Sequence, residues 1–194
     1  MALQLFLVDN GITMKQHWPE ACNLLRTLTW RLLEYDDDGM ELYFTDPTAE
    51  VVPSRRNEEV NDFVRAMEKA CPSSQRAHKT DIVPMLKQLM NKYAIDVCGR
   101  GLHAKKKMII VLTDGVWQGS SHERVFDFFQ YELRSLEQWY QPPNTIGQLS
   151  LEARKEALRK ERPISVQFVQ FGSDAAATIL LQQLDEDFAR AGYM

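Results

Sequence analysis

The stretch LQLFLVDNGIT at residues 3–13 decides how we interpret this chain. Its first part, Leu3–Val8, is almost continuously apolar, which is typical of a short strand buried on both faces of a parallel sheet. Its second part, Asp9–Thr13, is polar and begins with a carboxylate where that strand should end. The same design returns at Met108–Leu112, which is followed by Thr113-Asp114-Gly115. We therefore expect two buried parallel strands, each with an aspartate at its carboxyl end.

Amphipathic helices are expected between and after these strands. In five segments the apolar residues recur at three- and four-residue steps, the spacing of one helix face. These segments predict helices over Pro19–Tyr35, over Asn57–Ala70, from Thr80 onward with Thr80 as the N-cap, over His122–Trp139 and over Ala175–Phe188.

Three other segments favour extended structure. Ile164–Phe171 predicts a third buried strand. Met40–Thr45 and Thr48–Val52 flank the turn-forming pair Asp46-Pro47, so they predict either a hairpin or a strand with an edge partner.

This order of elements predicts a doubly wound α/β fold. Strands separated by helices of this length need crossover connections, which give a mostly parallel sheet with helices on both faces. A length of 194 residues suits one such domain, 1–194, which we interpret as one domain of a longer protein. Ligands of doubly wound sheets bind beyond the carboxyl ends of the strands, where Asp9 and Asp114 are both expected.

Residues 141–163 are predicted to be an insertion in this fold. A proline-rich break comes first, and the highly charged segment Leu151–Arg162 then predicts a helix exposed to solvent. Leu151, Ala157 and Leu158 form its narrow apolar edge. The helix is either simply solvated or a surface for a partner.

Composition and charge narrow the possible functions. A net charge of -4 gives no electrostatic attraction to nucleic acid or to an anionic membrane, and Lys105–Lys107 stands alone as a basic run before a strand. No apolar run reaches the roughly 20 residues that span a bilayer. The 3 cysteines have neither an even number nor a C-x-x-C spacing, so they favour free thiols and a cytoplasmic location. The oligomeric state is not indicated.

Oxygen-bearing side chains are expected to meet at the carboxyl edge of the sheet. Asp9 and Asp114 follow two strands, Thr13 lies in the loop after the first, and Thr80 lies at a loop-to-helix junction. Carboxylates and hydroxyls suit a hard cation, so the predicted ion is Mg²⁺ or Mn²⁺.

These residues resemble a known family. Asp9-x-Gly11-x-Thr13, Thr80 and Asp114 are similar to the metal-ion-dependent adhesion site of von Willebrand factor A (vWA) domains, whose pattern is D-x-S-x-S, a threonine and an aspartate. The resemblance extends from Leu3 to about Phe188. The stretches YDDDG at 35–39 and QFVQFG at 167–172 are similar to intracellular fungal members.

The resemblance implies a Rossmann-like vWA fold and a binding function without catalysis. It assigns the cation to Asp9, Gly11, Thr13, Thr80 and Asp114, and it implies that an acidic side chain of a partner protein completes the coordination. Gly11 stands where the family has its first serine, so one hydroxyl ligand is missing. Either water takes its place or the site holds no metal, and Gly11→Ser is expected to strengthen metal binding.

Trp117 follows Asp114 in the loop that should border this site. It is either an exposed aromatic contact for the partner, at the rim of the site, or a side chain buried under a neighbouring loop.

Two other functions remain open at this point. One is a metal-free vWA scaffold, in which Asp9 accepts backbone N–H bonds, Thr80 caps its helix and Asp114 forms a turn. The other is a phosphatase, because Asp9-x-Gly11-x-Thr13 also resembles the D-x-D-x-T motif of the haloacid dehalogenase family. There the second aspartate is the general acid, and Gly11 in its place would leave proton delivery without a donor.

Overall fold

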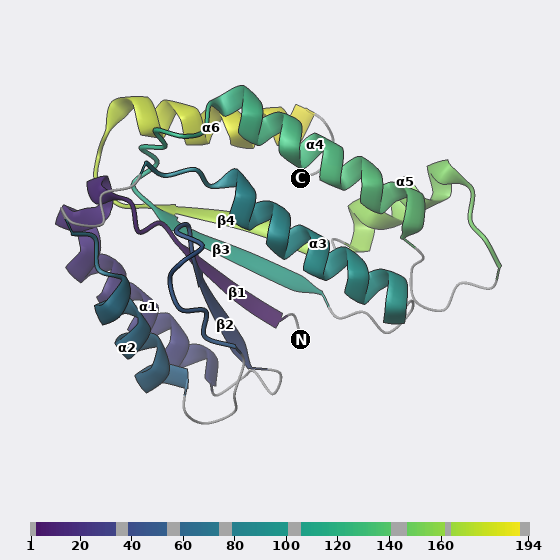
Figure 1. The fold of residues 1–194 in the computed structure, drawn as a ribbon. Helices are drawn as coiled ribbons and strands as arrows, with labels where there is room; N and C mark the ends of the chain where they lie inside the picture. Colours follow the sequence, from purple (N-terminus) through teal and green to yellow (C-terminus); the bar gives the residue numbers. More distant parts are fainter. Residues whose placement is uncertain are drawn as a thin grey trace.

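A four-stranded parallel sheet forms the centre of the protein (Figure 1). The computed structural model describes residues 3–33, 39–53, 59–73, 79–100, 106–140, 147–161 and 164–190. The strands are β1 (Leu3–Val8), β2 (Met40–Phe44), β3 (Lys107–Thr113) and β4 (Ile164–Gln170). Their order across the sheet is β2-β1-β3-β4, and all neighbouring pairs are parallel.

Helices cover both faces of the sheet. The described elements are the 3-10 helix η1 (Ile12–His17) and the α-helices α1 (Trp18–Leu33), α2 (Glu59–Ala70), α3 (Val83–Arg100), α4 (His122–Trp139), α5 (Leu151–Glu161) and α6 (Ala175–Arg190). In Figure 1, α1 and α2 lie on one face, whereas α3, α4 and α6 lie on the other. From β1 the chain moves to β2 on one side, and from β3 it moves to β4 on the other. Crossover connections between parallel strands share one handedness. Because these two connections run in opposite directions across the sheet, their helices lie on opposite faces, and the doubly wound α/β fold is confirmed.

The two central strands divide the core into two layers. Phe6 and Val8 of β1 pack with α1 and α2, whereas Leu5 and Leu7 pack on the side of α3 and α4. All of them are at most 1 % exposed. Side chains of a strand alternate between the faces, so a strand buried on both sides must be apolar at nearly every position. This explains the continuous apolar runs of β1 and β3.

The third strand differs from the prediction. β4 is an edge strand of the described sheet, and most of its side chains are only partly buried. Its sequence ISVQFVQ alternates apolar with polar residues from Ile164 to Phe168, which is the pattern of a strand with one face turned toward solvent. The expectation of a third fully buried strand is therefore wrong.

The segments around β2 and α3 also differ in detail. Met40–Phe44 pairs with β1 in parallel, and the segment after the Asp46-Pro47 turn contributes one antiparallel bridge, between Leu42 and Val52. Helix α3 begins at Val83, three residues after Thr80, so Thr80 is not its N-cap. The carboxylate of Asp81 instead accepts a hydrogen bond from the Val83 backbone N–H at 3.2 Å.

The charged insertion is packed against the domain at one side. Leu158 of α5 is buried in the same core layer as α4, whereas Leu151 is 49 % exposed. Arg154 of α5 donates hydrogen bonds to the carbonyls of Leu149 and Gln138, and Gln138 lies in α4. The predicted helix therefore exists, and one part of its apolar edge fastens it to α4. Residues 141–146 and 162–163 of the insertion lie outside the described residues.

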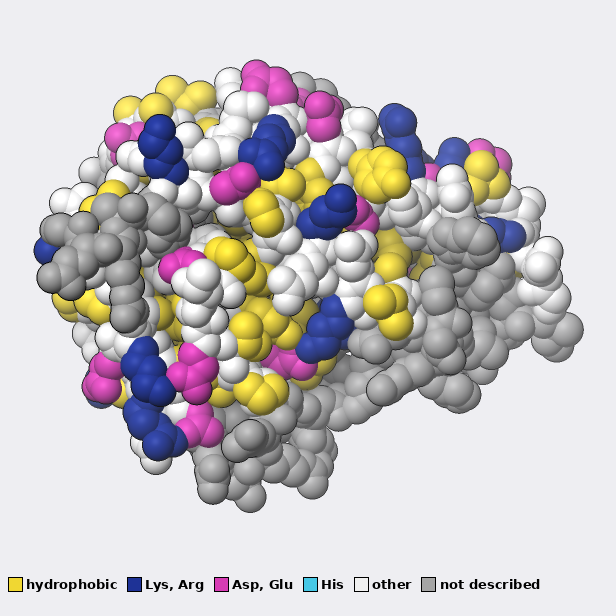
Figure 2. Space-filling view, in the orientation of Figure 1, with side chains coloured by type: hydrophobic (Ala, Val, Ile, Leu, Met, Phe, Trp, Pro, Cys, Tyr) yellow, Lys and Arg dark blue, Asp and Glu magenta, His cyan; other side chains and the backbone are white. Residues whose placement is uncertain are grey.

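The surface carries charges of both signs. On the face shown in Figure 2, Lys and Arg side chains lie among Asp and Glu side chains and do not gather into one patch. No helix in the described part of the chain combines the length and the apolar character needed to cross a membrane.

Candidate metal and partner-binding site

The candidate site lies where the chain changes direction between β1 and β3. β1 leads to β2 on one side and β3 leads to β4 on the other, so this is the switch point at which doubly wound sheets bind ligands. Val8 pairs with Leu112, and the Asp9 backbone N–H continues the ladder to the Leu112 carbonyl at 2.8 Å. Asp9 and Asp114 therefore follow two adjacent strands at the same edge.

The carboxylate of Asp9 is fully buried and surrounded by hydrogen-bond donors. Oδ1 accepts from the Gly11 N–H at 2.9 Å and from the Thr80 hydroxyl at 2.8 Å. The Thr45 hydroxyl lies 3.4 Å from the same oxygen and is nearer to the Asn10 side-chain oxygen, at 3.1 Å. Oδ2 accepts from the Thr113 hydroxyl at 2.8 Å. The predicted convergence of Asp9 and Thr80 is present in the structure, and they meet through a direct hydrogen bond.

Burial raises the pKa of Asp9 above its ordinary value of 3.8. The hydrogen bonds from Gly11, Thr113 and Thr80 act in the opposite direction, because they stabilise the charged carboxylate. The negative charge of Asp114 adds a smaller contribution to the rise. The site is therefore one where a positive charge would be stabilised.

Thr113 and Thr45 are site residues that the sequence reasoning missed. The Thr113 hydroxyl donates to Asp9, and it accepts from the Gly115 N–H and from the Trp117 indole N–H, both at 2.9 Å. With one proton and two lone pairs, this hydroxyl has no capacity left for a cation. Thr113 ends a strand that pairs with β1, so its polar side chain beside Asp114 was the available signal.

Asp114 forms the turn after β3. Oδ1 accepts from the Val116 N–H at 2.9 Å, whereas Oδ2 receives no hydrogen bond within the described residues. The next residue, Gly115, has a φ of 78°, and a Cβ there would lie 2.8 Å from the Cβ of Ala177 in α6. A glycine is therefore required to turn the chain against α6, and this turn fixes the position of the Asp114 carboxylate.

The Gly11 position is filled by a neighbour. A Cβ added to Gly11 would lie 2.0 Å from the Thr80 hydroxyl oxygen and 3.2 Å from Asp9 Oδ1. Gly11 therefore gives the Thr80 hydroxyl the room to reach Asp9. Our expectation for Gly11→Ser is corrected, because a serine would displace the Thr80 hydroxyl and would exchange one ligand for another rather than add one.

Thr13 contributes an unsatisfied hydroxyl. Its Oγ1 is buried, and it has no hydrogen-bond partner among the described residues. Buried hydroxyls normally have a partner, so an unpaired one in η1, close after β1, indicates that a ligand or a water belongs there.

Trp117 is not an exposed rim contact. Its side chain is 7 % exposed, its indole N–H donates to Thr113, and its ring packs on Phe168 at a centroid distance of 5.8 Å. The ring is buried because the turn at Gly115 folds the loop back over the sheet. The exposed side chain in this loop belongs to Gln118.

A cavity of about 490 Å³ opens beside the site, at the carboxyl ends of β1 and β2. Asn10, Asp46, Glu50 and Lys69 are among the residues that line it. The Asn10 side-chain oxygen accepts a hydrogen bond from the Asp46 N–H at 2.9 Å. The side-chain N–H groups of Asn10 have no partner among the described residues.

The oxygen atoms at this site have the chemistry that a hard divalent cation prefers. There are fewer of them than in the vWA metal-site pattern, because Gly11 stands where that pattern has a serine. The Thr80 hydroxyl gives its proton to Asp9 and keeps its lone pairs. Among the described residues, the Thr13 hydroxyl has no partner and Asp114 Oδ2 receives no hydrogen bond. These are all oxygen ligands, as Mg²⁺ and Mn²⁺ prefer. The described residues contain no cluster of three or more His, Cys, Asp or Glu side chains that could hold a metal ion. Hydroxyls must therefore complete the set.

Comparison with known proteins supports the fold and does not identify a family. Neither a protein-family model nor a curated protein sequence matches this chain. Among solved structures, the chain is similar to the pilus adhesin SpaC from Lactobacillus rhamnosus GG in its open conformation, with a TM-score of 0.51 and 12 % sequence identity. The similarity covers 97 % of this chain and 30 % of the adhesin chain, so this chain spans less than a third of its structural neighbour. At this identity the likeness extends to the fold alone.

Proposed function

We propose that this chain is a vWA-type protein-interaction domain. In this proposal the edge formed by β1 and β3 holds Mg²⁺ or Mn²⁺ and presents the cation to an acidic group of a partner protein. The observation that carries the proposal is the position of Asp9 and Asp114 directly after the adjacent strands β1 and β3, with the Thr80 hydroxyl hydrogen-bonded to Asp9.

The residues have different parts in this proposal. Thr13, Thr80 and Asp114 have oxygens whose lone pairs are not all used by the described residues, and these oxygens would contact the cation. Asp9 is fully buried and would act through its charge and through the orientation that it gives to Thr80. Gly11 supplies space rather than a ligand. When bound, the cation supplies a positive charge that one acidic partner group can neutralise.

Two features support binding rather than catalysis. Asp9 has no exposed surface, and both of its oxygens accept hydrogen bonds, so no carboxylate oxygen is available as a nucleophile. The position that would carry the general acid of a phosphatase is Gly11. The mixed charges on the face in Figure 2 favour a protein partner over nucleic acid or an anionic membrane.

The metal-free scaffold is a second proposal, and a specific observation favours it. The hydrogen bonds from Gly11, Thr80 and Thr113 satisfy the Asp9 carboxylate without any cation. In that case the domain binds its partner through its surface alone, and the same residues serve stability.

Titration calorimetry and thermal melting with Mg²⁺ and with Mn²⁺ separate the two proposals. A cation bound only by the native state stabilises it by about 2.7 kcal/mol at 100 times its Kd, and the melting temperature rises with concentration. We expect such a rise for the wild-type protein and its loss in Asp114→Asn. Neither heat nor a shift in the wild-type protein at millimolar cation would refute the metal-dependent proposal and support the scaffold.

A further inference from the structure

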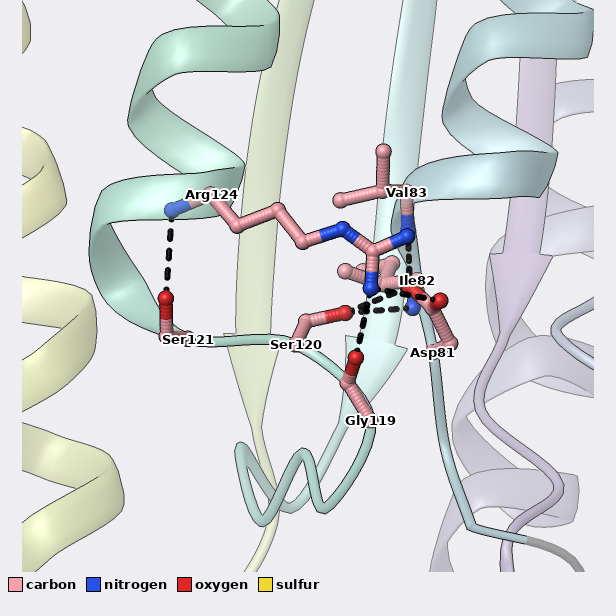
Figure 3. A network of polar contacts seen from close by, with 7 residues as sticks. All are labelled: Asp81, Ile82, Val83, Gly119, Ser120, Ser121 and Arg124. Carbon is pink, nitrogen blue, oxygen red and sulfur yellow. Dashed lines mark hydrogen bonds and ion pairs between the residues drawn. The ribbon is translucent and has the colours of Figure 1, made fainter.

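A network of polar contacts joins the Thr80 loop to the loop after β3 (Figure 3). Asp81 lies beside Thr80, and its Oδ1 accepts from the Ser120 hydroxyl at 2.6 Å. Its Oδ2 pairs with the Arg124 guanidinium at 2.8 Å. The same guanidinium nitrogen donates to the Gly119 carbonyl at 2.7 Å. We call Asp81, Ser120 and Arg124 the clamp.

The backbones of the two loops are in direct contact beneath the clamp. The Gly119 N–H donates to the Thr80 carbonyl at 2.8 Å, and the Ile82 N–H donates to the Ser120 hydroxyl at 3.2 Å. A Cβ on Gly119 would lie 2.9 Å from the Asp81 Cβ and 3.0 Å from the Thr80 carbonyl oxygen. The loops therefore meet more closely than any residue other than glycine permits at this position.

The placement of Arg124 indicates a specific task. It lies in the first turn of α4, where the helix dipole disfavours a positive charge. Ser121 caps this turn by accepting from the Arg124 backbone N–H at 3.3 Å, so the base of the side chain is held in place. From there the guanidinium reaches across to Asp81, as Figure 3 shows.

We propose that the clamp positions Thr80 for cation binding, an inference that rests on the proposed metal-dependent function. Arg124, Ser120 and Asp81 touch neither the cation nor the partner and act through the Thr80 backbone. They hold the Thr80 hydroxyl against Asp9 with its lone pairs free. The clamp also keeps the Asp81 carboxylate engaged, so that it does not compete with Asp114 for the cation.

This proposal makes a prediction whose sign differs from that of simple electrostatics. Arg124 carries a positive charge near a cation site, so removing that charge alone would strengthen cation binding. If Arg124 positions Thr80, then Arg124→Ala weakens binding instead. Residues that orient metal ligands typically change metal affinity by about 10-fold or more, so we expect a decrease of about 10-fold.

The experiment measures Mn²⁺ affinity by calorimetry for the wild-type protein and for the variants Arg124→Ala, Arg124→Lys and Arg134→Ala. Arg124→Lys keeps the charge but has a shorter side chain without the planar guanidinium, so it should recover part of the affinity. Arg134→Ala is the matched control, because Arg134 lies on the same helix and is exposed, and its one hydrogen bond within the described part of the chain goes to Gln130 at 3.5 Å. Circular dichroism confirms that each variant is folded at the temperature used.

Gly119→Ala tests the same contact without a change of charge. The added methyl group separates the two loops and should also weaken Mn²⁺ binding. If the wild-type protein binds Mn²⁺ and Arg124→Ala binds it equally or more tightly, the clamp is a structural contact only and the inference is overturned. If the wild-type protein binds no Mn²⁺, the proposed function itself fails, and the inference fails with it. The wild-type titration therefore distinguishes the two failures.

Discussion

Replacement of Gly11 by alanine is expected to destabilise the protein through a collision with one hydroxyl. The new Cβ would lie 2.0 Å from Thr80 Oγ1, so the Thr80 hydroxyl must leave Asp9. A hydrogen bond to a charged group contributes about 1.5–3 kcal/mol to stability. The Gly11 backbone has a φ of −64° and a ψ of 162°, which alanine adopts without strain. Alanine therefore raises the free energy of unfolding by about 0.4–1 kcal/mol, because it restricts the unfolded chain more than glycine does. The net expectation is a loss of about 1–2 kcal/mol.

The collision predicts strong coupling between positions 11 and 80. Thr80→Ala removes the same hydrogen bond and should cost about 1.5–3 kcal/mol. In that background the Gly11→Ala methyl group meets the Cβ of residue 80 at 3.4 Å, an ordinary contact, and Asp9 Oδ1 at 3.2 Å, which requires a small shift. The second substitution should then be neutral or slightly stabilising. The interaction energy of the double-mutant cycle is therefore expected to be about −1.5 to −3 kcal/mol.

Urea unfolding in the presence of EDTA measures this cycle without any contribution from cation binding. The free energies of unfolding of the four proteins are compared at one pH and temperature. Additivity within about 0.5 kcal/mol would show that the two residues do not compete for the same space. A Gly11→Ala protein more stable than the wild type would refute the reasoning in the same way.

Three further outcomes are expected. Thr13→Val should weaken Mn²⁺ binding several-fold in calorimetry, whereas Thr27→Val, a control that removes an exposed hydroxyl bonded to its own helix, should leave it unchanged. Because the pKa of Asp9 is raised in the folded state, the protonated form of Asp9 contributes stability that is complete below pH 3.8 and is lost as the pH rises through the folded pKa. Urea unfolding from acid to neutral pH should show this decrease in the free energy of unfolding. An equal decrease in Asp9→Asn would contradict the assignment to Asp9. Trp117→Phe should lower the free energy of unfolding in urea by about 1 kcal/mol, because the hydrogen bond to Thr113 is lost, and should leave partner binding intact. A large loss of partner affinity would instead show that Trp117 contacts the partner.

Local sequence was sufficient to predict the strands and most helix positions. β1 and α4 occur at the predicted residues, and β3 extends the predicted strand by one residue at each end. Such predictions succeed because the periodicity of apolar residues is a local property that burial imposes on each element separately. β4 was misinterpreted because its apolar residues were given more weight than its alternation.

The carboxylates at the ends of β1 and β3 could also be predicted, since parallel strands end at one edge of a sheet. The partners of those carboxylates could not. Thr113 and Thr45 reach Asp9 across 104 and 36 residues of chain, and the burial of Trp117 depends on Phe168 in another strand. Contacts of this kind depend on strand register and on the path of the loops, which no local pattern records.

The amino-acid sequence alone determined the alternation of strands and helices, the doubly wound arrangement and the aspartates at two strand ends, because each follows from hydrophobic periodicity and chain connectivity. Tertiary structure alone decided that Gly11 makes room for the Thr80 hydroxyl, that the Thr113 hydroxyl is fully used, and that Arg124 holds the Thr80 loop. Hydrogen bonds require donor and acceptor within about 3 Å. Only the packed backbone brings residues so far apart in the chain to that distance.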